Sequence, residues 1–285
     1  MAYLKGNLKE VLSNRLEPKE LNKIYRSYDI IGDIAIIRIP KSLQQKRELI
    51  AKAIIDTHNG VKSVWQQVSS VTGDYRLRRL DYILGEKKSE TIYKEHNCIY
   101  KTDLQETYFS PRLSYERLRI AKLVQPEETV LNMFAGVGCY SVAIANHSKP
   151  LKVYSIDINP VAIKYLQENI RLNKGEKTII PLLGDSKKLI EEKLQNISDR
   201  IIMPLPERAY EYLEYALLAL KPDGGWIHYY DFEYAKTKED AIKKNIKKVS
   251  KKLNLICNFE VKFGRIVRSI GPGWYQIVLD IFIKN

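Results

Sequence analysis

The sequence is poor in cysteine, in long apolar segments and in acidic residues relative to basic ones. Its three cysteines, Cys98, Cys139 and Cys257, are odd in number and widely spaced, so neither a disulfide framework nor a cysteine-based zinc site is predicted. No run of about 18 apolar residues occurs, so no membrane-spanning helix is predicted. The first residues, MAYLKGNLKEVL, contain no apolar core followed by a cleavage site, so we expect a cytoplasmic protein.

The shortage of acidic residues leaves a strongly basic chain. Lys and Arg total 47 against 34 for Asp and Glu, which gives a formal net charge of +13 at pH 7. Such an excess favours a polyanionic partner, because contacts with phosphates release the counterions that surround a nucleic acid. We therefore expect a nucleic-acid partner, although a lysine-rich proteome also produces basic proteins.

The length of 285 residues allows one or two domains with a sizeable buried core. The N-terminal part mixes strand-like stretches with helical apolar spacing, and from residue 130 onward strands and helices alternate. We expect a small α/β domain at 1–107 and a larger domain at 108–285. The N-terminal elements are predicted as helices within 1–25 and at 42–57, strands at 29–40, 61–71 and 91–108, and a basic loop at 72–88.

The segment 130–160, VLNMFAGVGCYSVAIANHSKPLKVYSIDINP, is the most informative part of the chain. A short strand leads into a turn with Gly136 and Gly138, a helix follows, and a second strand ends at Asp157. The glycines let the backbone approach a ligand, and the carboxylate can accept both ribose hydroxyl hydrogens. The pattern FxGxG, which starts at Phe134, differs from GxGxxG and favours an adenosyl ligand such as S-adenosylmethionine. The alternative is a tight turn without a ligand.

The alternation of strands and helices predicts a doubly wound, Rossmann-like sheet of the class I methyltransferase type. In such a sheet the carboxyl ends of the strands line one crevice. This places six candidate donor-binding residues around one pocket, with solvated loop acids as the alternative for the two aspartates: Gly136, Asp157, Ile158, Asp185, Ser186 and Pro204.

Methyl transfer to a ring nitrogen that carries an acidic proton requires a base for that proton. It also benefits from a cation beside the carbonyl oxygen where negative charge develops. Glu116 and Arg76 are candidates for these roles, but spacing alone does not select them. We expect a helix to begin at Ser110-Pro111, so the alternative for Glu116 is an intrahelical pair with Arg112. The alternative for Arg76 is a phosphate contact or a solvated charge.

Several motifs together resemble the archaeal and eukaryotic tRNA (guanine-37-N1)-methyltransferases and their relatives in wyosine synthesis. They follow the family's order and spacing over most of the chain: GDYRLRRLDYILG (73–85), YFSPRLSYERLRI (108–120), NMFAGVG (132–138), DINP (157–160), IIMPLP (201–206) and IHYYDF (227–232).

The resemblance implies a role for individual residues. Arg76 would be catalytic and lie on the target guanine, and Glu116 would be the general base. Arg117 would contact the methyl donor, and Tyr108 would lie beside the donor and the target base. The acids already placed in the pocket would bind the donor.

Two features depart from the family's usual pattern. This chain has Pro204-Leu205-Pro206 where the guanine methyltransferases usually have Asn-Leu-Pro, so Pro204 offers the catalytic pocket only its carbonyl and its shape. Pro-Leu-Pro resembles the archaeal branch that in some members also methylates carbon 7 of the tricyclic wyosine precursor. Many members also carry a further N-terminal domain that reads the tRNA elbow, and this chain resembles the part after it.

We therefore expect an enzyme that transfers a methyl group from S-adenosylmethionine to N1 of guanosine 37. Its expected partner is the anticodon stem-loop of tRNA; no membrane or metal is expected, and the protein is expected to be monomeric. One alternative is the sister branch that transfers the donor's aminocarboxypropyl group, which usually has Met-Gly-Tyr in place of MPLP. The other is a tRNA-binding module without catalysis, which the presence of both Arg76 and Glu116 disfavours.

Overall fold

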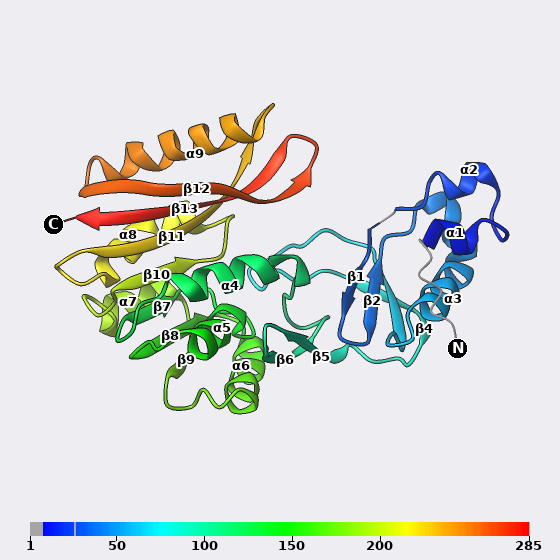
Figure 1. Ribbon diagram of the computed structural model, residues 1–285, viewed down its shortest axis with the longest axis horizontal. Coiled ribbons are helices and arrows are strands. Elements are labelled where there is room, and N and C mark those ends of the chain that lie inside the picture. Colours follow the sequence, from blue (N-terminus) through cyan, green and yellow to red (C-terminus); the bar gives the residue numbers. More distant parts are fainter. Residues whose placement is uncertain (1–7, 26, 285) are drawn as a thin grey trace. The chain divides into compact units, whose positions relative to one another are not determined.

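The computed structural model describes residues 8–25 and 27–284. The chain forms two compact units, of which unit 1 comprises 1–95 and 99–112 and unit 2 comprises 96–98 and 113–285. None of the helices in the described ranges combines the length and apolar character that a membrane span needs. Figure 1 labels the elements of both units.

Unit 1 is built on a four-stranded sheet of order β1–β2–β3–β4, in which β2 and β3 are parallel and the outer pairs are antiparallel. A separate pair, β5 and β6, forms a two-stranded sheet. The elements are α1 (Leu8–Leu12), α2 (Pro18–Leu21), β1 (Asp29–Ile31), β2 (Ile34–Ile37), the 3-10 helix η1 (Lys41–Lys46), α3 (Arg47–Thr57), β3 (Ser63–Gln67), β4 (Leu80–Gly85), β5 (Glu90–Glu95) and β6 (Cys98–Asp103).

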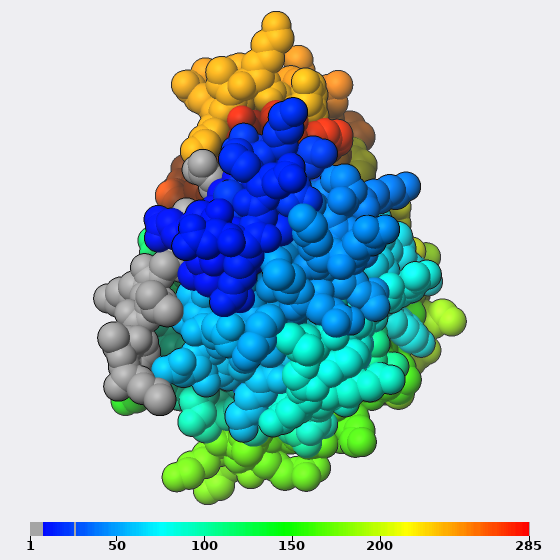
Figure 2. Space-filling model, turned by 90° about the vertical axis from the view of Figure 1, so that its right-hand side faces the viewer, coloured from blue at the N-terminus to red at the C-terminus, as the bar shows by residue number. Residues whose placement is uncertain are grey.

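The core of unit 1 lies between its sheet and its helices. Leu8 and Leu12 of α1 and Ile50 and Ile54 of α3 are buried in one cluster with Ala35 and Ile37 of β2. Figure 2 looks at this unit, with the dark-blue segment that holds α1 and α2 lying against the lighter blue residues that follow it. The strand, turn and strand expected over 29–40 are confirmed, because β1 and β2 pair across a turn whose Gly32 has φ 57°.

Unit 2 contains a seven-stranded sheet of order β12–β13–β11–β10–β7–β8–β9, in which β13 runs antiparallel to β11 and β12. This confirms the doubly wound fold predicted from the sequence. The strands are β7 (Thr129–Asn132), β8 (Lys152–Asp157), β9 (Ile179–Leu183), β10 (Arg200–Met203), β11 (Gly225–Tyr234), β12 (Asn258–Gly271) and β13 (Trp274–Lys284). The helices are α4 (Ser114–Leu123), α5 (Cys139–His147), α6 (Pro160–Leu172), α7 (Ser186–Lys193), α8 (Ala209–Ala219) and α9 (Lys238–Leu253).

Alternation along β11 places different helices on the two faces of this sheet. Ile227 and Tyr229 belong to the apolar cluster formed with α7, α8 and α9. The intervening residues His228 and Tyr230 point the other way, and Tyr230 reaches Glu116 of α4. Since successive side chains on a strand face opposite sides, α4 covers the face opposite α7–α9.

Two details differ from the sequence-based expectation. The helix expected to begin at Ser110-Pro111 starts as a 3-10 turn, η2 (Pro111–Leu113), and α4 proper begins at Ser114. Helix α7 was not predicted, although its N-cap Asp185 accepts a hydrogen bond from the Lys187 N–H. Asp185 was interpreted as a ligand-binding residue or a solvated loop acid, and its capping role was not predicted.

Candidate functional site

The turn after β7 brings its backbone against the carboxylate at the end of β8. The Gly136 N–H donates to Asp157 Oδ2 at 2.6 Å, and the Asn159 N–H donates to Oδ1 at 2.9 Å. Burial raises the pKa of Asp157, although these backbone hydrogen bonds act in the opposite direction. An ionised carboxylate has about four lone-pair positions. Lone-pair positions therefore remain for hydroxyl groups of a ligand.

Local sequence explains why this turn has its shape. Gly138 adopts φ 90° at the N-cap of α5, and a Cβ there would lie 2.3 Å from Cδ1 of Leu166. A residue with a side chain is therefore disfavoured both by the left-handed backbone and by the neighbouring helix. At the next strand end, the Asn159 side chain accepts from the Val161 N–H, and Pro160 is the first residue of α6.

Asp185 is tied to a residue that the sequence analysis missed. Its Oδ1 accepts from the Tyr212 hydroxyl at 3.0 Å as well as from the helix N–H that it caps. The Tyr212 ring in turn lies edge-on to Phe134, with 5.2 Å between centroids. Burial and the neighbouring carboxylate raise the pKa of Tyr212 to about 12, so this hydroxyl remains a donor at neutral pH. Tyr212 thus links Phe134 and Asp185.

The remaining residues predicted to bind the adenosyl ligand lie at the ends of neighbouring parallel strands. The Ser186 hydroxyl, which is buried, donates to the Met133 carbonyl just after β7. Ile158 is 42% exposed beside the carboxylate at the end of β8. Pro204 directly follows β10 and is half-buried. The pairing of β7 with β8 and β10, and of β8 with β9, aligns these strand ends on one edge of unit 2.

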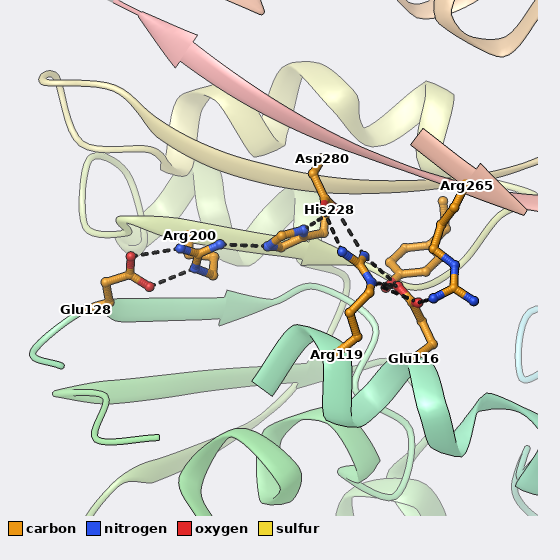
Figure 3. Close-up of polar contacts among 8 residues, drawn as sticks. Glu116, Arg119, Glu128, Arg200, His228, Arg265 and Asp280 are labelled. Carbon is orange, nitrogen blue, oxygen red and sulfur yellow. Dashed lines mark hydrogen bonds and ion pairs between the residues drawn. The ribbon is translucent and has the colours of Figure 1, made fainter. Parts of the chain in front are cut away.

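Glu116, on the helix that covers the other face, is enclosed by side-chain donors (Figure 3). It is only 1% exposed. Its Oε1 accepts from Nη2 of Arg119 at 2.7 Å and from the Tyr230 hydroxyl at 2.8 Å, and Nε of Arg119 lies 3.0 Å from Oε2. Nη1 of Arg265 lies 3.7 Å from Oε2. The carboxylate is therefore fixed in position by residues of α4, β11 and β12.

Arg119 is itself held by Asp280 of β13. Its Nη1 donates to Asp280 Oδ2 at 2.6 Å and its Nη2 to Oδ1 at 3.1 Å. Asp280 Oδ1 also lies 2.7 Å from Nδ1 of His228, whose Nε2 is 2.9 Å from Nη1 of Arg200. Because a guanidinium has no acceptor, Nε2 must accept and Nδ1–H must donate to Asp280. This determines the tautomer of the fully buried histidine.

The network ends in a further ion pair, between Arg200 and Glu128. Arg200 donates to both carboxylate oxygens of Glu128, at 2.7 and 2.9 Å. Burial lowers the pKa of His228 more than Asp280 raises it, so the imidazole is neutral. Burial would raise the pKa of Asp280, but His228 and Arg119 hold it well below its usual range. Removing one partner of such a buried pair typically costs about 3–5 kcal/mol.

The ion pair considered from the sequence as an alternative for Glu116 is not the one that forms. The partner of Glu116 on its own helix is Arg119, at i+3. Arg112 precedes α4 and its Nε donates to Asp29 Oδ1 at 2.7 Å. The i, i+4 argument failed because the first turn after Pro111 is a 3-10 helix and not an α-helix.

In unit 1, Arg76 lies at the end of a tight loop. Thr72 and Leu77 form an isolated antiparallel bridge, and Arg76 between them has φ 55°. Its guanidinium carbon lies 4.3 Å from the centroid of the Tyr108 ring. A non-glycine residue in this backbone region costs about 1–3 kcal/mol and clusters at functional sites. The contact between Arg76 and Tyr108 brings together two residues that are far apart in the sequence.

The candidate residues thus form groups within their own units. Arg76 and Tyr108 contact each other in unit 1. Glu116 and the candidate residues at the strand ends, which we call the donor edge (Gly136, Asp157, Ile158, Asp185, Ser186 and Pro204), belong to unit 2. Arg117, beside Glu116 on α4, is buried. Sequence reasoning missed Arg119, Tyr212, Tyr230, His228 and Asp280. For Arg119 the i+3 spacing from Glu116 was an available signal.

Comparison with known protein families gives matches over both units. Residues 91–261 match the family described as TRM5/TYW2 methyltransferase domain. Residues 8–88 match the family described as TYW2 N-terminal domain. The first match alone spans more than half of the chain.

Individual relatives agree with these matches. Trm5b of Pyrococcus abyssi, a tRNA (guanine(37)-N(1))-methyltransferase, is 42% identical over 94% of this chain and 78% of its own length. Its crystal structure matches with a TM-score of 0.87 at 39% identity, covering 100% of this chain and 82% of that chain. Taw21 of Saccharolobus solfataricus, a tRNA 4-demethylwyosine(37)-methyltransferase, is 40% identical over 95% of this chain and 98% of its own length. The structure of Methanocaldococcus jannaschii TYW2 in complex with AdoMet matches with a TM-score of 0.67 at 28% identity, covering 91% of this chain and 100% of that chain.

Proposed function

The chain belongs to the TRM5/TYW2 methyltransferase family, and on this premise we propose that it methylates the purine base at position 37 of tRNA. The favoured acceptor is N1 of guanosine 37, and S-adenosylmethionine supplies the methyl group. The observation that carries the proposal is the donor edge of unit 2, where Gly136 and Asp157 meet at 2.6 Å beside the ends of β7, β9 and β10.

The residues at this edge fit an adenosyl ligand. Asp157 keeps lone-pair positions for the ribose hydroxyls. Ile158 offers an exposed apolar surface for the adenine face, and Asp185 is positioned by Tyr212 to accept from its amino group. Arg117 and Tyr108 are proposed to contact the donor, and Pro204 to close the pocket by its shape.

Two charged side chains are proposed to act on the base that receives the methyl group. We assign Glu116 as the base that takes the N1 proton of the guanine as the N1–methyl bond forms. Arg76 would stabilise the negative charge that develops on O6. Proximity of the target base to the methyl group of the donor supplies much of the rate.

Carbon 7 of 4-demethylwyosine is the second candidate acceptor. The likeness to Taw21 over nearly the whole of that protein favours it, as does Pro204 in place of an amide side chain. In that reaction carbon 7 attacks the methyl group first and then loses its own proton. Glu116 would receive that proton, so the same base serves either acceptor.

One assay separates these candidates. Unmodified tRNA and tRNA that bears the tricyclic base are each incubated with the protein and labelled S-adenosylmethionine, and the nucleosides are identified by mass. We expect one methyl group on guanosine 37. Methylation of the tricyclic base alone would show that the acceptor is carbon 7 of 4-demethylwyosine and not N1 of guanosine 37. Addition of an aminocarboxypropyl group, or no transfer to either RNA, would contradict methylation.

The role of Arg76 has a separate test. Arg76→Ala should bind tRNA normally and transfer at least about 100-fold more slowly, whereas transfer at the parental rate would remove Arg76 from the mechanism. Tyr25→Ala, which alters an exposed residue of the same unit, serves as the matched control.

The affinity for tRNA should also fall steeply with salt. We further propose that the protein acts as a monomer in the cytoplasm, which sedimentation and cell fractionation test.

A further inference from the structure

The hairpin formed by β12 and β13 extends beyond the donor edge of unit 2 (Figure 1). Met203, the last residue of β10, pairs in register with Tyr229 of β11. β11 continues for five more residues to Tyr234, which pairs with Trp274 at the start of β13. At about 3.3 Å per residue this extension is roughly 16 Å long. The hairpin tip therefore lies on the side of the sheet where the strand ends carry the donor residues.

Two exposed aromatic residues mark this tip. Tyr234 is 52% exposed and Trp274 is 46% exposed, with their ring centroids 5.6 Å apart. Gly273 has φ 69°, and a Cβ there would lie 2.7 Å from the Tyr234 ring. The Ala235 N–H also donates to the Gly273 carbonyl at 2.9 Å. The turn thus holds the two rings in a defined position although both face solvent.

The part of the hairpin nearest its tip carries charge of one sign. Between Glu260 and Asp280 the sequence has no acidic residue, while it has Lys262, Arg265 and Arg268. The acids of the adjoining part of β11 are Asp231, which is buried and paired with Lys248, and Glu233. A polyanion is therefore the complementary partner for this strand pair.

The same hairpin is connected to the proposed base. Arg265 lies 3.7 Å from the Glu116 carboxylate and 4.8 Å from the centroid of the exposed Tyr115 ring. Six residues further along β12 the chain reaches the turn that carries Trp274. From Arg265 beside Glu116, β12 therefore leads past Arg268 to the turn that precedes Trp274.

We propose that Tyr234 and Trp274 form a stacking platform for an unpaired RNA base in the loop that carries the acceptor nucleotide. The inference rests on the proposed function, because it takes RNA as the substrate. Bases stack on aromatic side chains without regard to sequence, and cations beside the ring hold the backbone. The platform would hold the loop in an open form while one nucleotide reaches Glu116.

The test compares three variants in binding of an anticodon-arm RNA stem-loop. Trp274→Ala should weaken the affinity about 5- to 150-fold, and Trp274→Phe should retain most of it because a ring remains. Leu255→Ala is the matched control, since Leu255 is 86% exposed in the turn before β12, at the opposite edge of the sheet. The affinity for S-adenosylmethionine should be unchanged in all three, which also shows that the variants are folded.

A direct optical readout keeps the proposal testable if Trp274→Ala does not fold. Binding of the stem-loop should quench indole fluorescence in the parent and not in Trp274→Phe, and Tyr234→Ala should weaken binding in the same direction. Parental affinity in Trp274→Ala would overturn the platform. So would an equal loss for a blunt RNA duplex, which has no unpaired base, or a dimer in sedimentation that Trp274→Ala abolishes without any change in RNA affinity. Stem-loop binding that depends on Trp274 in a protein that transfers no methyl group would instead refute the proposed function alone.

Discussion

Asp157 accepts hydrogen bonds from two backbone N–H groups, whereas Glu116 accepts them from the side chains of Arg119 and Tyr230. The first carboxylate is positioned by the turn in which it lies, and it keeps lone pairs for a ligand. The second is positioned by side chains from three different elements, and its main partner depends on Asp280 in turn. The donor edge therefore owes its geometry to local backbone, and the region around Glu116 owes its geometry to buried charge.

The largest effect should follow from breaking the charged region. Arg119→Ala leaves Glu116 and Asp280 buried without their shared cation, so we expect the free energy of unfolding to fall by about 3–5 kcal/mol. Urea denaturation measures this change. Arg171→Ala, at an exposed position near the end of α6, should change stability by no more than about 0.5 kcal/mol. Equal stabilities of the two variants would mean that the network does not stabilise the fold.

The donor edge should respond in its ligand affinity, and at Asp157 also in stability, because an asparagine amide can accept from only one of the Gly136 and Asn159 N–H groups. Asp157→Asn keeps the shape of the side chain but loses the charge that accepts ribose hydroxyls, a loss of about 1.5–3 kcal/mol in binding. Isothermal titration with S-adenosylmethionine should therefore show an affinity roughly 10- to 150-fold weaker. Because Asp157 has a raised pKa, donor affinity of the parent should also decline on acidification at a pH above the ordinary aspartate range. An unaltered affinity in Asp157→Asn would exclude it from the donor site.

Acid should weaken the charged region through His228. Its folded-state pKa lies below the ordinary value of 6.5, so as the pH falls below 6.5 the unfolded chain binds a proton that the folded chain does not. This contribution to stability is complete above pH 6.5 and is lost as the pH falls towards the folded-state pKa, at about 1.4 kcal/mol per pH unit. Unfolding curves of the parent and of His228→Gln, recorded between pH 7 and pH 5, give the slope of the free energy of unfolding against pH for each protein. A slope that His228→Gln leaves intact would assign it to other groups.

The smallest effect concerns the glycine turn. Gly138→Ala places a side chain at φ 90° and against Leu166, which should cost about 1–2 kcal/mol. Gly60→Ala is the control, because a Cβ there meets no atom within 4 Å and the backbone is not left-handed. Thermal unfolding of both variants measures the difference. The turn would not require glycine if the two melted at the same temperature.

The same contrast explains how far the sequence could lead. Gly136, Gly138 and Asp157 lie within one unit of strand, turn, helix and strand, so pattern reasoning predicted the fold and placed the turn beside Asp157. Tyr230 and Asp280 lie 114 residues from Glu116 and 161 residues from Arg119, respectively. No local spacing connects such pairs, and only the order of the strands brings them together. Sequence reasoning therefore named Glu116 but not the residues that position it.

We infer that Asp157 serves binding of the donor whereas Glu116 serves the reaction. Single-turnover transfer to tRNA, measured for Asp157→Asn and Glu116→Gln over a series of S-adenosylmethionine concentrations, tests this division directly. At saturating donor, Asp157→Asn should approach the parental rate, and Glu116→Gln should remain about 10²- to 10⁴-fold slower. Transfer by Glu116→Gln at the parental rate, or a defect in Asp157→Asn that saturating donor does not relieve, would contradict the account.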